Sequence, residues 1–147
     1  MASLLGNTLD NNYRMDQLLG KGGMGAVYRA RDVALNRDVA IKVMHAHFTD
    51  DEGFRARFLQ EARAIAALDH PGIVQVYTFG QDLGFLYIVM DFIPGQNLSG
   101  WLRRLADEKK IVALSESLAL VRRIAWALHY AHEKGILHRD IKPANIM

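Results

Sequence analysis

The chain has 147 residues, of which half are hydrophobic and 23% are charged, so a packed core is expected and extensive disorder is not. Lys and Arg exceed Asp and Glu by only 18 to 16, which argues against a nucleic-acid-binding surface. No Cys is present, which excludes disulfides, thiolate metal sites and a Cys nucleophile, and fits a cytoplasmic protein.

The N-terminal residues carry no basic segment followed by a long apolar one, so no signal peptide is predicted. Residues 1–12 are interpreted as a flexible leader before the first strand. The most apolar stretch, residues 111–128, is interrupted by Glu116, Arg122 and Arg123. We therefore predict no membrane-spanning segment in this chain.

Five strand-like runs occupy most of the first ninety residues. They are predicted at residues 13–20, 26–32, 37–44, 73–80 and 85–91. A helix is predicted between the third and fourth runs, at residues 51–68, with Thr49, Asp50 and Asp51 available to cap its start. Its apolar stripe contains one acid, Glu61, three residues after Phe58 and four before Ile65.

The remaining sequence is predicted to be mostly helical. A short helix is indicated at residues 98–105, and a longer one at residues 115–134, with Ser115 as N-cap and Gly135 at its end. The longer helix is apolar on more than one side, so we expect it inside a domain. Strands followed by helices predict an α+β fold with two segregated parts.

A glycine-rich segment joins the first two predicted strands. Its residues Gly20, Gly22 and Gly25 fit the pattern G-x-G-x-x-G, in which main-chain N–H groups can approach phosphate oxygens closely. A flexible turn is the alternative. A strand follows the segment where a dinucleotide-binding fold needs a helix, which makes dinucleotide binding the poorer interpretation.

Two charged residues stand at positions that otherwise look apolar. Lys42 lies within the run VAIKVM, and Glu61 lies on the helix stripe. Buried charges of opposite sign are costly unless paired, so we predict that Lys42 and Glu61 form an ion pair. The alternative for Lys42 is that its ammonium extends to the edge of the sheet.

A third group of polar residues follows the long helix, in the segment HRDIKPAN. Asp140, Lys142 and Asn145 can converge if this segment is a loop, and Pro143 disfavours a helix there. Asp can accept a hydroxyl proton, Lys can neutralise phosphoryl oxygens, and Asn can bind Mg²⁺. An ordinary polar turn is the alternative.

Together these segments resemble protein kinases of the eukaryotic type. The similarity covers residues 13–147 and rests on GKGGMGAV, VAIK, FLQEARAIAALDHPGIV, YIVMDFIPGQNL and HRDIKPAN, in this order. Lys142 before Pro143 looks like the serine/threonine branch, and GKGGMGAVYRARD is similar to bacterial kinases. The resemblance implies a five-stranded antiparallel sheet with one inserted helix as an N-lobe at residues 13–93. A hinge exit and a partial helical lobe would follow at residues 94–147.

The resemblance implies a role for each matching residue. Lys42 would contact ATP phosphates and pair with Glu61. Met90 would be the gatekeeper, main-chain groups of Asp91 and Ile93 would bond the adenine edge, and Asn97 lies where a ribose contact is expected. Asp140 would be the catalytic base, assisted by Lys142, with Asn145 as Mg²⁺ ligand. The expected nucleotide-binding residues also include Leu19, Gly20, Lys21, Gly22, Gly23, Met24, Gly25, Val27 and Ala40.

The family pattern continues with an Asp-Phe-Gly motif, which occurs nowhere in these 147 residues. We therefore expect the polypeptide to bind nucleotide at best and to lack phosphotransfer alone. The resemblance implies a cytoplasmic signalling enzyme that phosphorylates Ser or Thr of protein substrates. The alternatives are a non-catalytic module that binds ATP or a partner kinase, and, less well supported, a small-molecule phosphotransferase. Self-association through exposed surface of the later helices is also expected.

Overall fold

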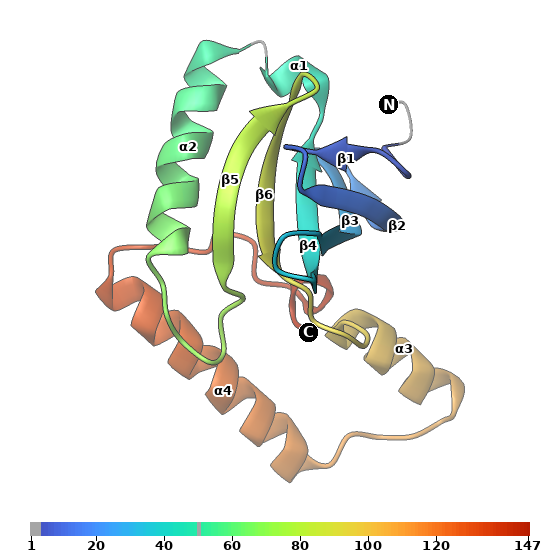
Figure 1. The fold of residues 1–147 in the computed structure, drawn as a ribbon. Helices are drawn as coiled ribbons and strands as arrows, with labels where there is room; N and C mark the ends of the chain where they lie inside the picture. Colours follow the sequence, from blue (N-terminus) through green and yellow to red (C-terminus); the bar gives the residue numbers. More distant parts are fainter. Residues whose placement is uncertain (1–3, 50) are drawn as a thin grey trace. The chain divides into compact units, whose positions relative to one another are not determined.

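The computed structural model describes residues 4–49 and 51–147, and the chain divides into two compact units (Figure 1). The first unit consists of Met1–Asp69 and Val74–Phe92, and the second of His70–Ile73 and Ile93–Met147. The division at residue 92 falls one residue before the boundary expected from the sequence. The short segment His70–Ile73 was expected in the first part but belongs to the second.

The first unit is built on a single antiparallel sheet of six strands in the order β1-β2-β3-β4-β6-β5. All five predicted strands are present, and a two-residue strand at the N-terminal side adds the sixth. The strands are β1 (Thr8–Leu9), β2 (Tyr13–Gly22), β3 (Gly25–Asp32), β4 (Arg37–Met44), β5 (Val76–Asp82) and β6 (Phe85–Asp91).

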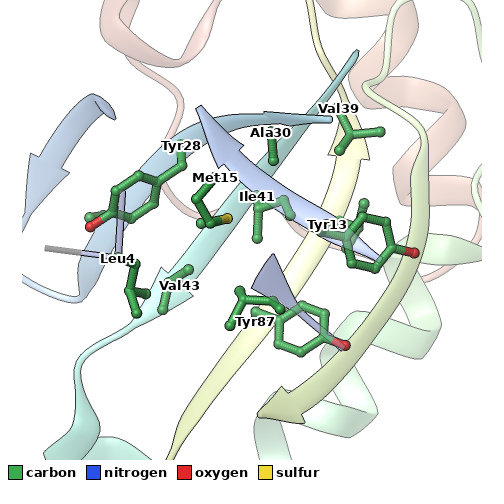
Figure 2. Close-up of a cluster of buried hydrophobic side chains, with 12 residues drawn as sticks. Leu4, Tyr13, Met15, Tyr28, Ala30, Val39, Ile41, Val43 and Tyr87 are labelled. Atoms are coloured by element: carbon green, nitrogen blue, oxygen red, sulfur yellow. The ribbon is translucent and has the colours of Figure 1, made fainter. Parts of the chain in front are cut away.

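The sheet has two unlike faces because side chains alternate along each strand. One face, here called the core face, carries the main apolar cluster of the unit. Figure 2 shows this cluster, in which Tyr28, Ile41 and Val43 from β3 and β4 gather with Met15 from β2. Ile41, Val43 and Val89 are completely buried, so the core face provides most of the hydrophobic stabilisation of the unit.

The expectation of a flexible leader is wrong for residues 4–12, while residues 1–3 lie outside the described part of the chain. Leu4 and Leu9 are buried in the core cluster, and β1 pairs with β2. Two main-chain bonds, from Gly6 N to Met15 O and from Met15 N to Asn7 O, hold this segment in place. The segment was interpreted as a leader because most of its other residues are polar, but Leu4 and Leu9 pack into the core cluster.

Two helices belong to the first unit. The four-residue helix α1 (Ala46–Thr49) was not predicted, and α2 (Glu52–Ala66) occupies most of the expected range. Asp51 is the N-cap of α2, and its carboxylate accepts a hydrogen bond from Phe54 N at 2.9 Å. Asp50, the other acidic candidate for the cap, lies outside the described residues. Figure 1 shows α2 alongside β5.

The second unit contains α3 (Leu98–Asp107), α4 (Leu114–Glu133) and the short 3₁₀ helix η1 (Pro143–Asn145). Helix α4 starts after Ala113 rather than at Ser115, and no side chain caps it. Its end agrees with the prediction, because Gly135 adopts the positive φ of 74° that favours glycine after a helix. Among the described residues of the two helices, only Ala127 and Ala131 are buried.

The segment His70–Ile73 packs on α4 through aromatic rings. The His70 ring lies 5.0 Å from the Trp126 ring and 5.1 Å from the Tyr130 ring, measured between centroids. Gly72 N donates to His70 Nδ1 at 2.9 Å, which closes the turn. Within the described residues, no helix is long and apolar enough to cross a bilayer.

Candidate functional site

The glycine-rich segment forms the hairpin between β2 and β3, with Gly23 and Met24 at its tip. Gly22 pairs with Gly25, and Lys21 with Ala26, so the hairpin is a continuous part of the sheet. A Cβ added at Gly20, Gly22 or Gly23 would meet no atom within 4 Å, which leaves their main chain open to an approaching group. This openness fits the predicted contact with phosphates.

Gly25 has a different role, because a Cβ at this position would lie 2.0 Å from the carbonyl oxygen of Val43. Glycine is therefore required here for close packing of β3 against β4. His45, which the sequence analysis did not single out, also holds the hairpin. The main-chain N–H of His45 donates to Met24 O at 3.0 Å, and its ring Nε2 lies 3.2 Å from Gly22 O.

Three of the predicted nucleotide-binding residues, Val27, Ala40 and Met90, lie on one face of the sheet, opposite the core face and here called the front face. Val27 pairs with Lys42, and Ala40 pairs with Met90. Side chains of directly opposed residues in an antiparallel sheet point to the same side. Leu19 falls at the irregularity between Leu18 and Gly20 in β2, and its side chain is 44% exposed.

The predicted ion pair between Lys42 and Glu61 is not formed. Lys42 is half-buried on β4, whereas Glu61 is exposed on α2, and no ion pair joins them among the described residues. The expectation that Glu61 lies on the buried stripe of its helix is therefore wrong. Lys42 keeps the position on the sheet that the sequence indicated.

The reason lies in the direction of the buried stripe of α2. Phe58 and Ala62 are buried, while Phe54 and Ala66 are half-buried, so the covered line follows a spacing of four residues. Four residues advance about 400° around the helix, so residues spaced by four lie on nearly the same side of it. Glu61 is about 100° away from Ala62 around the helix axis and therefore lies outside the buried side. The sequence alone fitted a spacing of three or four equally well.

The end of β6 carries the predicted gatekeeper and the residue that follows it. Met90 is half-buried on the front face, and Asp91 pairs with Val39 on the core face. Asp91 N donates to Gln75 O at 3.0 Å, and the Asp91 carboxylate accepts a short hydrogen bond from the Tyr77 hydroxyl. Of the main-chain groups of Asp91, the carbonyl is thus the remaining candidate for the adenine edge.

The second unit holds the other predicted site residues. Ile93 is exposed, and Asn97 is the N-cap of α3, with its side-chain oxygen accepting from Gly100 N at 2.9 Å. A ribose contact was expected at Asn97 from the sequence, whereas its capping role was not predicted. Its position after Gly95 and before an apolar helical run was the signal that could have indicated a cap.

Asp140, Lys142 and Asn145 converge as the sequence predicted. Lys142 Nζ lies 2.8 Å from Asp140 Oδ2, and Asn145 Nδ2 donates to Asp140 Oδ2 at 3.0 Å and to Asp140 O at 2.8 Å. The segment before η1 has no regular secondary structure, and Pro143 begins η1. The interpretation as an ordinary polar turn loses its support because the side chains of Lys142 and Asn145 both contact the Asp140 carboxylate.

The Asp140 carboxylate is exposed, so its electrostatics come from its two partners. The hydrogen bond from Lys142, followed by that from Asn145, holds the pKa of Asp140 below its usual value. The backbone also supports the arrangement, since Asp140 N donates to His138 Nδ1 at 3.2 Å. Arg139, between them, has a φ of 63°, which is uncommon for a residue other than glycine.

Mg²⁺ requires about six oxygen ligands in near-octahedral geometry. Asn145 can supply its side-chain oxygen, since its nitrogen is directed at Asp140. The described residues contain no group of three or more His, Asp or Glu side chains arranged to hold a metal ion. Among the described residues, the Asn145 oxygen thus fits one of the ligands that such a site needs and does not complete it.

The comparisons with known proteins agree with these features. The family described as the protein kinase domain matches residues 13–147. A probable serine/threonine-protein kinase of Clostridium acetobutylicum is 40% identical over 144 residues, which is 98% of this chain and 21% of the relative. The serine/threonine-protein kinase PknJ of Mycobacterium tuberculosis is 44% identical over 135 residues, which is 92% of this chain and 22% of the relative.

Among solved structures, the kinase domain of Mycobacterium tuberculosis PknI is similar to this chain with a TM-score of 0.81 and 36% identity. The match covers 100% of this chain and 59% of that structure. The chain thus spans about a fifth of the length of the curated relatives it matches.

Proposed function

Because this chain belongs to the protein kinase domain family, we propose that it forms the nucleotide-binding and catalytic-loop part of a serine/threonine protein kinase. Such an enzyme transfers the γ-phosphate of ATP to Ser or Thr hydroxyls of protein substrates. The observation that carries the proposal is the convergence of Lys142 and Asn145 on the Asp140 carboxylate. The relatives named as serine/threonine-protein kinases support Ser and Thr hydroxyls as the phosphate acceptors.

In this proposal the catalytic loop acts mainly by position and charge. Asp140, kept ionised by its partners, accepts a hydrogen bond from the substrate hydroxyl and then its proton. Lys142 lies close enough to Asp140 to place its ammonium beside the phosphoryl oxygens as charge develops on them. Asn145 would hold Mg²⁺ through its side-chain oxygen, and the ion would supply positive charge against the phosphates.

The front face of the first unit is the proposed nucleotide surface. Val27, Ala40 and Met90 supply an apolar platform for adenine, and the open glycines of the hairpin face phosphate oxygens. Lys42 shares this face and is assigned to the α- and β-phosphates. Its pairing with Glu61 stays a prediction, which requires Glu61 to turn toward the sheet when nucleotide binds.

The proposal is tested by isothermal titration calorimetry of the 147-residue polypeptide with ATP, in the presence and absence of Mg²⁺. We expect saturable binding that weakens by about tenfold in Lys42→Met, as for the loss of one charge-assisted contact. Lys110→Met is the matched control, because Lys110 is exposed and forms an ion pair with Glu108, outside the proposed surface. Absence of binding, or equal affinity in Lys42→Met, would reject the nucleotide surface.

The second candidate function is a non-catalytic module that binds ATP or a partner kinase. Two observations favour it for this polypeptide taken alone. Asp-Phe-Gly is absent from its sequence, and Lys42 and Glu61 form no ion pair with each other in the described part of the chain. We expect no phosphotransfer from the pure polypeptide to a generic protein substrate. Mg²⁺-dependent incorporation of labelled phosphate that disappears in Asp140→Asn would contradict this expectation.

We also propose that the polypeptide acts in the cytoplasm, in signalling.

We further propose that the polypeptide associates with itself through α4. Leu114, Leu118 and Val121 are 74%, 60% and 60% exposed and follow one another at helical spacing. An apolar hollow of about 430 Å³ lies beside them, lined in part by Trp101 and Leu120. Light scattering should show concentration-dependent association that decreases in the double variant Leu118→Glu, Val121→Glu; a monomer at high concentration would reject it.

A further inference from the structure

Four polar residues meet on the core-face side of the sheet, at the end where β3 and β6 finish and β4 and β5 begin. They are Asp32, Arg37, Tyr77 and Asp91, here called the strand-end clamp. Arg37 Nε lies 3.5 Å from Asp32 Oδ2, and the Arg37 guanidinium carbon lies 3.7 Å from the centre of the Tyr77 ring. The Tyr77 hydroxyl donates to the Asp91 carboxylate.

Tyr77 reaches this position because β5 is irregular there. Val76 pairs with Met90 and Thr78 with Val89, so Tyr77 is an extra residue opposite a regular strand. Such a bulge redirects the side chain of the extra residue. Arg37 and Tyr77 come from strands that are not neighbours, because β6 lies between β4 and β5. The clamp therefore ties together strands that the ladder alone does not join.

The other end of the clamp is firmly held. Asp32 is 2% exposed and accepts hydrogen bonds from Asn12 Nδ2 at 3.0 Å and from Leu35 N at 3.1 Å. Burial alone would raise the pKa of Asp32, but the bonds from Leu35, Asn12 and Arg37 together keep it below its usual value. A buried carboxylate that stays ionised gives Arg37 a fixed anionic partner.

Asp91 is held from two sides. Its N–H donates to Gln75 O, and its carboxylate is bound by Tyr77, so both its main chain and its side chain are restrained. Gln75 is itself fixed, since its side-chain nitrogen donates to Ala66 O at 3.3 Å and to Val76 O at 3.1 Å. Met90, the residue before Asp91, lies on the front face with Ala40.

We propose that Tyr77 and Arg37 are positioning residues for nucleotide binding, which hold Asp91 so that its main-chain carbonyl is presented to the adenine edge. This inference rests on the proposed nucleotide surface. Neither residue touches the nucleotide, because both lie on the core-face side of the sheet. By restraining Asp91 before adenine binds, they lower the conformational entropy that is lost on binding.

The test is the substitution Tyr77→Phe, which removes one hydroxyl and keeps the ring under Arg37. Tyr87→Phe is the matched control, since the Tyr87 hydroxyl also lies within hydrogen-bond distance of an aspartate, Asp10, away from the proposed site. Binding of ADP and of inorganic tripolyphosphate, which has no base, is measured for each protein by NMR titration. Melting curves verify that each variant is folded.

We expect Tyr77→Phe to weaken ADP about three- to tenfold, as for a partial loss of one hydrogen bond, with tripolyphosphate binding unchanged. Hydrogen exchange at the Asp91 amide should accelerate in the same variant. Tyr87→Phe should change neither affinity. Arg37→Met, which removes the stacking cation, should give the same selective loss for ADP.

Each result decides between the two proposals. Wild-type protein that binds neither ADP nor tripolyphosphate rejects the nucleotide surface, and the positioning role with it. Wild-type binding that Tyr77→Phe leaves unaltered rejects the positioning role alone. Equal weakening of ADP and tripolyphosphate in Tyr77→Phe also rejects it, because a general loosening of the fold does not distinguish base from phosphate.

Discussion

At the scale of single residues, the glycines of the G-x-G-x-x-G motif have different structural roles. Gly20 and Gly22 leave open space on which a phosphate can be placed, whereas Gly25 allows β3 to approach the carbonyl of Val43. The motif G-x-G-x-x-G alone suggests that all three glycines serve phosphate binding. The role of the third glycine in strand packing depends on the position of β4, which the motif does not contain.

We expect Gly25→Ala to reduce the free energy of unfolding by about 1–3 kcal/mol, because the new methyl group overlaps main-chain atoms that cannot move aside easily. Gly22→Ala, with no atom within 4 Å of its new Cβ, should change stability by less than about 0.5 kcal/mol. Urea unfolding followed by circular dichroism measures both. Equal stability of the two variants would contradict the packing role of Gly25.

A second prediction at this scale concerns the titration of Asp140. Its pKa is lowered in the folded chain, so any stabilisation it provides is present above about pH 4 and is lost as the pH falls through the lowered value. Lys142→Met removes the largest cause and should move the titration midpoint of Asp140 upward. NMR of side-chain carboxyl carbons measures the midpoint, with Lys110→Met as control. An unchanged midpoint in Lys142→Met would show that Lys142 does not bind Asp140.

The sequence predicted the convergence of Asp140, Lys142 and Asn145 better than it predicted the ion pair. Asp140, Lys142 and Asn145 lie within six residues of one another, so local backbone geometry suffices to bring them together. Lys42 and Glu61 come from a strand and a helix, and their meeting depends on the rotation of α2 about its axis. A small error in that rotation separates them, and no local pattern fixes it.

At the scale of elements, long and periodic segments were predicted and very short ones were not. Strands β2, β3, β4 and β6 occur close to their predicted ranges, and α4 ends at Gly135 as expected. The two-residue β1 and the four-residue α1 carry too few residues for a periodic pattern. Tyr77 was missed for a related reason, because a bulge breaks the alternation from which its direction could be inferred.

The turn between β5 and β6 offers a prediction at this scale. Leu83 and Gly84 both have positive φ, 50° and 76°, and leucine is poorly suited to that conformation. Leu83→Asn should therefore stabilise the chain by about 0.5–1 kcal/mol, since Leu83 is 56% exposed and buries little surface. Thermal unfolding measures the gain. Leu83→Ala is the control, because alanine removes the leucine side chain but keeps the strain; an equal gain in both would contradict the turn argument.

At the scale of the whole molecule, the two units differ in how much apolar surface each buries by itself. The core cluster of the first unit contains twelve buried residues, whereas the helices of the second unit bury only Ala127 and Ala131 among the described residues. Stability should follow this division, because local unfolding free energies depend on buried apolar contacts.

We therefore expect amide hydrogens of the first half of α4 to exchange with solvent faster than those of β3 and β4 in the isolated polypeptide. Mass spectrometry of peptides from the two regions measures the difference. ATP, if it binds the front face, should slow exchange in the sheet and leave that half of α4 largely unaffected. Equal protection of α4 and the central strands would show that the second unit has support beyond its own helices.

The docking of residues 4–12 has a practical consequence for recombinant work on this chain. The kinase family match begins at residue 13, and a gene trimmed to that boundary would look complete by comparison with the family model alone. Such a trimmed protein would lack Leu4 and Leu9, two buried side chains of the core cluster that also contains Met15 and Tyr87. Expression should therefore begin at or before Leu4, since poor solubility of a shorter version would reflect an opened core rather than a fault of the kinase fold.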